Sequence, residues 1–94
     1  MKIKKVSNMI GHSGRPIVNQ FIISTAEAIY FKSYNSIIVK QCFTEGVFLD
    51  ENFWEYSTTT GKYRNLFLNE TKKETQAKID SGEYKLANLN KEVA

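Results

Sequence analysis

The chain has 94 residues, 41% hydrophobic and 13% aromatic, and its 13 basic against 10 acidic residues give a formal charge of +3. This length suits one domain, residues 1–94, whose single core needs nearly every large apolar residue and leaves little chain for a deep active-site cavity. The mildly basic charge excludes the strongly acidic class of DNA-mimicking inhibitors, and it is too small to establish nucleic-acid binding.

The cellular compartment of the protein is predicted from its one cysteine and from the short lengths of its apolar runs. Cys42 is alone, so an internal disulfide is excluded and a reducing cytosol is favoured. Apolar runs extend over only a few residues and no signal-peptide pattern opens the chain, so we expect neither a membrane span nor secretion. We therefore expect the protein to act in the cytoplasm.

The first 15 residues are predicted to form a basic, loop-like arm outside the regular core. MKIKK has little periodicity, and the following stretch holds Ser, Asn, two Gly and the only Pro. From Pro16 to Tyr34 the residues are β-branched and aromatic, which predicts two antiparallel strands joined by a hairpin connection at STAE, residues 24–27. Alternation places Phe31 and Ser33 on one face of the second strand and Lys32 and Tyr34 on the other.

Two further strands are predicted before residue 57. SIIVKQCF, residues 36–43, is the first, and a tight connection at Gly46 leads into the second, VFLDENFWEY, residues 47–56. An extended strand would place the neighbours Phe53 and Trp54 on opposite faces, so one of them is a candidate interface anchor.

Helical spacing replaces the strand pattern after Ser57. Tyr63, Leu66 and Phe67 stand at i, i+3 and i+4, which predicts a core-facing stripe with Ser57 as the N-cap. A second helix follows, because Thr71 and Glu74 form a capping-box pattern and Gly82 suits the left-handed position after a helix.

The last predicted element is EYKLANL, residues 83–89, a closing strand or an extended tail with Tyr84, Leu86 and Leu89 as inward residues. The order of the predicted elements gives the α+β class. We expect a small, mainly antiparallel sheet, with a meander of three to four strands plus the C-terminal strand, covered by two short helices.

No catalytic or metal-binding motif is complete. TTTGKY lacks both the first glycine and the final Ser or Thr of a phosphate-binding Walker loop, and GHSGR has Arg15 where a nucleophile elbow has its last glycine. His12 and Cys42 are single residues with no spacing that pairs them or makes a zinc site. We therefore expect no enzyme activity, no cofactor and no metal.

Two interpretations of Ser57–Thr60 stay open: helix capping alone, or capping plus contact with an anion near Lys62.

Basic residues interleaved with aromatic ones are the remaining signal. If the ligand were nucleic acid, the cations would contact phosphates and the rings would stack on bases. At a net charge of +3 an ordinary surface with half-buried tyrosines is favoured over nucleic-acid binding. Tyr63 is expected in the core rather than in the contact surface. The candidate partner-binding residues are Arg15, Lys32, Tyr34, Trp54, Lys62 and Arg64.

The chain also resembles a group of short proteins encoded by tailed phages and related bacterial mobile elements. The resemblance extends from about residue 14 to residue 90. Its most specific parts are Phe31-x-Ser33-Tyr34, Tyr56-Ser57-x-Thr59-Thr60 and Lys62-Tyr63-Arg64 with Phe67-Leu68. It implies a phage or prophage origin and action in the bacterial cytosol, and it brings no catalytic residues.

Three functions remain open on these grounds. The first is a non-enzymatic protein that binds a host or phage protein, with inhibition of a host defence system such as CRISPR as the concrete expectation. The second is a small nucleic-acid-binding protein that uses the basic and aromatic residues. The third is a virion-associated structural component that self-associates through a strand edge.

Overall fold

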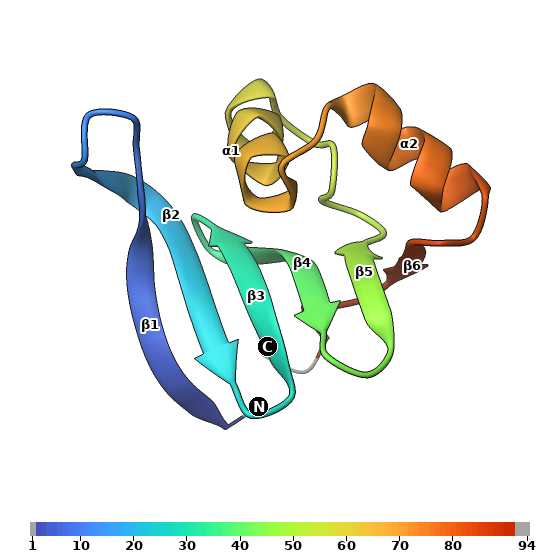
Figure 1. The fold of residues 1–94 in the computed structure, drawn as a ribbon, viewed down its shortest axis with the longest axis horizontal. Coiled ribbons are helices and arrows are strands. Elements are labelled where there is room, and N and C mark those ends of the chain that lie inside the picture. Colours follow the sequence, from blue (N-terminus) through green and yellow to red (C-terminus); the bar gives the residue numbers. More distant parts are fainter. Residues whose placement is uncertain (1, 92–94) are drawn as a thin grey trace.

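We describe residues 2–91 from a computed structural model of the chain, which shows an α+β fold (Figure 1). The elements in chain order are β1 (Ile3–Ile10), β2 (Pro16–Thr25), β3 (Ala28–Ser33), β4 (Ser36–Cys42), β5 (Gly46–Asp50), α1 (Thr58–Leu68), α2 (Lys72–Asp80) and β6 (Lys85–Ala87).

The sheet has six strands in sequential order, one or two more than the sequence predicts. Strands β1 to β5 form an antiparallel meander, whereas β6 pairs in parallel with β5, with Leu49 opposite Leu86. A parallel neighbour needs a crossover, and α1 and α2 supply it. Both helices consequently lie on one side of the sheet (Figure 1).

Strand β1 corrects the prediction of a loop-like arm. Ile3–Ile10 pairs along β2, with Val6 opposite Ile23 and Ser7 opposite Ile22. Register shifts near both ends of β1 interrupt the two-residue alternation, and most of the strand is exposed, so the sequence lacks the pattern of a half-buried strand. The loop is limited to residues 11–15, which join β1 to β2.

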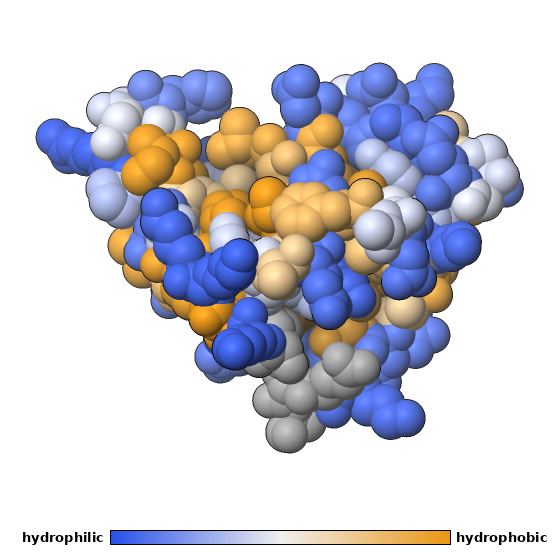
Figure 2. Space-filling model, turned by 60° about the horizontal axis from the view of Figure 1, so that its bottom comes forward, coloured by the Kyte–Doolittle hydropathy of each residue, from blue (hydrophilic) through white to orange (hydrophobic). Residues whose placement is uncertain are grey.

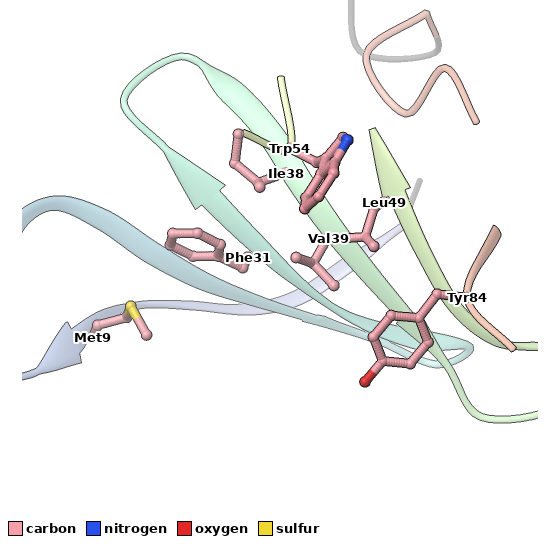
Figure 3. Packing of buried hydrophobic residues seen from close by; sticks show 7 residues of the cluster. All are labelled: Met9, Phe31, Ile38, Val39, Leu49, Trp54 and Tyr84. Carbon is pink, nitrogen blue, oxygen red and sulfur yellow. The ribbon is translucent and has the colours of Figure 1, made fainter. Parts of the chain in front are cut away.

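The core lies between the sheet and the helices, because Tyr63, Phe67 and Ile79 of the helices pack against the buried cluster. Figure 3 shows the seven buried residues of this cluster beside the strands. Phe31 at its centre is fully buried and stacks on Phe67 of α1 with 5.8 Å between ring centroids. Beside it, the hydroxyls of Ser33 and Thr60 form a buried hydrogen bond of 2.9 Å that ties β3 to α1. The buried hydrophobic cluster comprises Met9, Phe31, Ile38, Val39, Leu49, Trp54 and Tyr84.

A buried aspartate ends β5 and overturns the prediction of a strand through residue 56. One carboxylate oxygen of Asp50 accepts the backbone N–H groups of Asn52 and Phe53, both at 3.0 Å, and the other accepts that of Leu89 at 2.8 Å. The chain therefore turns at residue 51. Trp54 is only 5% exposed and Phe53 packs against the same cluster, so the prediction of Trp54 as an interface anchor is wrong.

The predicted helix signals are confirmed. Ser57 is the N-cap of α1, and its hydroxyl accepts the backbone N–H of Thr60 at 3.1 Å. Thr71 and Glu74 form the capping box of α2, and Gly82 follows that helix at a φ of 84°. In the closing strand Tyr84 is buried as expected, whereas Leu86 is 46% exposed because β6 is the short outer strand.

Candidate binding groove

A groove of about 700 Å³ separates the β1–β2 loop from the helices. One wall is formed by residues 11–17, and the other by the outward side of α1 and the start of α2. Figure 2 shows it as the indentation at the top of the view, with hydrophobic atoms at its base. The two walls come from parts of the chain about 50 residues apart, so no local motif could reveal it.

Backbone hydrogen bonds shape the loop wall. Gly11 donates to the carbonyl of Arg15 at 2.9 Å, and Gly14 donates to that of Gly11 at 3.0 Å with a φ of 80°. The Asn8 side chain donates to the carbonyl of Ile17 at 2.9 Å and fixes the start of β2. These bonds close a short loop and hold Arg15 at the rim of the groove.

The helix wall combines an apolar surface with a cation. Leu66 is 41% exposed in the groove, while Tyr63 is partly buried against the core, as expected for that residue. The Lys62 ammonium lies 5.3 Å from the centre of the Tyr63 ring. Lys62 and Arg15 form no ion pair within residues 2–91, so their charges are available to a ligand.

The acidic residues of the groove are engaged within the protein. Glu74 serves the capping box of α2. Glu70 forms an ion pair with Lys78 at 2.7 Å and accepts the Tyr84 hydroxyl at 2.6 Å. Arg15 and Lys62 therefore dominate the free charge of the groove.

Glu70, Lys78 and Tyr84 form a triad, and the pKa shifts of the three side chains follow from their contacts. Burial alone would raise the pKa of Glu70, but the hydrogen bonds from Lys78 and Tyr84 outweigh it, so the pKa lies below its usual value. The contact with Glu70 raises the pKa of Lys78. Burial, together with the bond to Glu70, raises the pKa of Tyr84 to about 12.

Arg64 is buried, which corrects the prediction that it contacts a partner. The side chain is 1% exposed, its guanidinium lies 5.2 Å from the Trp54 ring, and it donates to the Trp54 carbonyl and, at 2.9 Å, to the Asn65 side chain. Burial lowers the pKa of the guanidinium, with Glu55 and Glu70 acting in the opposite direction. The spacing in the sequence could have indicated this burial, because Thr60, Arg64 and Leu68 stand four residues apart and so lie on one face of α1.

A second hollow of about 630 Å³ lies on the other side of Lys62, over the start of α1. Ser57, Thr58 and Gly61 line it, and Lys72 at its edge is paired with Glu55 at 3.1 Å. The hydroxyl of Ser57 is occupied by capping. Capping is thus observed, and anion contact at Ser57–Thr60 stays a prediction.

Lys32 and Tyr34 lie away from the groove. Lys32 is on the sheet face opposite the helices, with its ammonium 5.9 Å from the Phe21 ring centre. Tyr34, 46% exposed, follows β3 at a φ of 55° and donates its N–H to the Asn19 carbonyl at 2.7 Å. Of the six predicted residues, only Arg15 and Lys62 line the groove.

The groove also contains His12, which sequence reasoning did not select as a contact residue. Cys42 is buried opposite Ala28, near the end of β2 remote from the loop that carries His12, so the two do not form a pair. Within residues 2–91, no group of three His, Cys, Asp or Glu could hold a metal ion. No helix in the same range has the length and apolarity to cross a membrane.

Comparison with protein families gives a match over residues 4–83 to the family of unknown function DUF8033. The match covers five of the six strands and both helices. No curated protein and no solved structure matches the chain.

Proposed function

We propose that this chain, which belongs to the DUF8033 family, is a non-enzymatic binding protein that holds a segment of a partner protein in the groove between residues 11–17 and α1. One observation carries the proposal: the groove joins an exposed apolar wall to two cations with no ion-pair partner in residues 2–91. Protein interfaces combine a hydrophobic core with a polar rim, and arginine is enriched among their hot spots.

The chemistry of the groove indicates the kind of segment it takes. Leu66 and Ile17 offer apolar surface for a partner side chain. The planar fork of Arg15 suits a carboxylate, and Lys62 adds a point charge on the opposite wall. We therefore expect an apolar side chain next to an Asp or Glu of the partner.

The resemblance to short proteins of tailed phages and mobile elements supports the biological setting. A small binding protein without its own chemistry acts by occupying a surface of its target. In that setting the target is a host or phage protein in the bacterial cytosol, and inhibition of a host defence system such as CRISPR is the concrete form of the proposal.

Affinity capture tests this function. The chain would be used as bait in a lysate of the bacterial host, with and without nuclease, beside the variant Arg15→Gln/Lys62→Gln. A matched control, Lys32→Gln/Lys40→Gln, removes the same charge from the opposite face of the sheet. We expect the parent chain to capture a specific protein with or without nuclease. The groove variant should no longer capture this protein, and the control variant should still capture it.

Other outcomes would refute the protein-binding proposal. If every captured protein is lost on nuclease treatment, capture depends on a shared nucleic acid, which favours nucleic-acid binding alone. Self-association without another partner would favour a structural component, for which β1 is the relevant edge because it is mostly exposed and pairs only with β2 in the described sheet.

A further inference from the structure

The sheet face opposite the helices carries aromatic rings and lysines in register. The residues paired across neighbouring strands point to the same side of a sheet. One such row crosses all six strands, and it consists of Val6, Ile23, Tyr30, Lys40, Phe48 and Lys85. Phe31, next to Tyr30, is in the core under α1, so this row faces away from the helices.

A second pair on the same face repeats the combination. Phe21 of β2 stands opposite Lys32 of β3, and the Lys32 ammonium lies 5.9 Å from the ring centre. In the first row the ammonium of Lys40 lies 5.7 Å from the centre of the Phe48 ring. All four of these side chains are partly exposed. Three aromatic rings and three lysines thus share this face.

No helix of the described chain covers these residues (Figure 1). None of the three lysines forms an ion pair within residues 2–91. The face therefore offers cations and ring surfaces together.

A hollow of about 250 Å³ lies on this face. Tyr30, Lys40 and Phe48 line it together with Asn88 and Leu89 from the segment after β6, and Glu45 is the one carboxylate among its lining residues. Its volume is below the range of about 300–1,000 Å³ that drug-sized ligands occupy, so it suits a single flat group rather than a whole ligand.

We propose that this face binds single-stranded nucleic acid, with bases stacked on Tyr30, Phe48 and Phe21 and phosphates at Lys32, Lys40 and Lys85. Tyr30 and Phe48 lie on strands separated by one intervening strand, so their backbones are about 10 Å apart. This distance lets the two rings stack on two different bases. An ammonium that moves from its ring to a phosphate uncovers that ring for a base. Stacking is independent of base identity, so binding is sequence-tolerant.

This surface is on the other side of the sheet from the groove, and the two proposals are independent. An acidic protein would use the lysines but would not require the flat rings. The test therefore changes charge and ring separately and keeps the apolar volume when a ring is removed.

The experiment measures fluorescence anisotropy of a labelled 12-nucleotide dT strand, titrated with the whole chain at several salt concentrations. The charge variant is Lys32→Gln/Lys40→Gln, and its matched control is Arg15→Gln/Lys62→Gln in the groove. The ring variant is Phe48→Leu, which keeps an apolar side chain. Unlabelled polyglutamate serves as the competitor that carries charge without bases, and circular dichroism checks that each variant is folded.

We expect the charge variant to lower the slope of log affinity against log salt by about 1.4, because each phosphate contact to a single strand contributes about 0.7. Phe48→Leu should weaken binding about tenfold or more with the slope unchanged. The groove variant should bind the strand as the parent does.

Four results would overturn the proposal: no binding of the strand at about 50 mM salt, equal loss in the charge variant and the groove variant, undiminished binding by Phe48→Leu, or displacement by polyglutamate as effective as by unlabelled dT. If Phe48→Leu is not folded, Tyr30→Leu replaces it with the same expectation.

Discussion

Arg64 is predicted from the sequence to lie at the surface, but the fold buries its side chain. Its guanidinium spans from α1 to the carbonyl of Trp54 and covers the Trp54 ring. We expect Arg64→Lys to lower the free energy of unfolding by about 2 kcal/mol, because the ammonium cannot make both hydrogen bonds and stays buried. Urea denaturation measures this. Arg15→Lys, at an exposed arginine, is the matched control and should change stability by less than about 0.5 kcal/mol.

Ser57 gives a second prediction at this scale. Removing its hydroxyl leaves the N–H of Thr60 without its cap, so Ser57→Ala should lower the free energy of unfolding by about 1 kcal/mol. Thr58→Ala is the control, because Thr58 is exposed and its side chain makes no hydrogen bond within residues 2–91. Partner binding by the folded Ser57→Ala protein should be retained. Loss of binding with unchanged stability would instead support an anion site at Ser57–Thr60.

At the scale of elements, Glu70, Lys78 and Tyr84 join the α1–α2 connection to α2 and to the start of β6. The raised pKa values of Tyr84 and Lys78 favour the protonated forms in the folded state. The contribution of Tyr84 is complete below about pH 10, the usual tyrosine pKa, and is lost as the pH rises toward about 12. The contribution of Lys78 has the same sign. The lowered pKa of Glu70 acts oppositely, since its contribution is present at neutral pH and is lost as the pH falls through that pKa.

Tyr84→Phe tests this triad. The variant keeps the ring under Lys78 and removes the hydroxyl that titrates. Urea midpoints of the parent should fall between about pH 9.5 and pH 11.5, and the fall should be smaller in the variant. Parallel curves for the two proteins would show that Tyr84 does not carry the alkaline loss.

The elements also differ in how far they could be predicted. Capping signals are local in the sequence. Ser57 and Thr71 therefore predict where α1 and α2 begin, and Gly82 predicts where α2 ends. Strand β1 was missed because its register shifts and exposure remove the alternation on which strand prediction depends. The end of β5 was missed because Asp50 acts through a buried carboxylate that reaches Leu89, and such a contact leaves no periodic signal.

At the scale of the whole molecule, several residues of the sequence patterns singled out as most specific have structural roles. Phe31 and Phe67 stack in the core, Ser33 bonds to Thr60, and Arg64 holds Trp54. The α+β class could be predicted because it follows from the order of the elements, whereas most of the candidate site depends on tertiary contacts such as these. The groove depends on how residues 11–17 approach α1, which is a property of the assembled fold.

The central claim is that a partner protein occupies that groove, and site-specific photocrosslinking tests it most directly. A benzophenone amino acid would replace Leu66, which is 41% exposed on the groove wall, or Phe43, which is 60% exposed just after β4 as the control. In nuclease-treated host lysate we predict a crosslinked protein at position 66, none at position 43, and loss of the product with Arg15→Gln/Lys62→Gln. Equal crosslinking at both positions, or a product at position 66 that persists without the two cations, would contradict the claim.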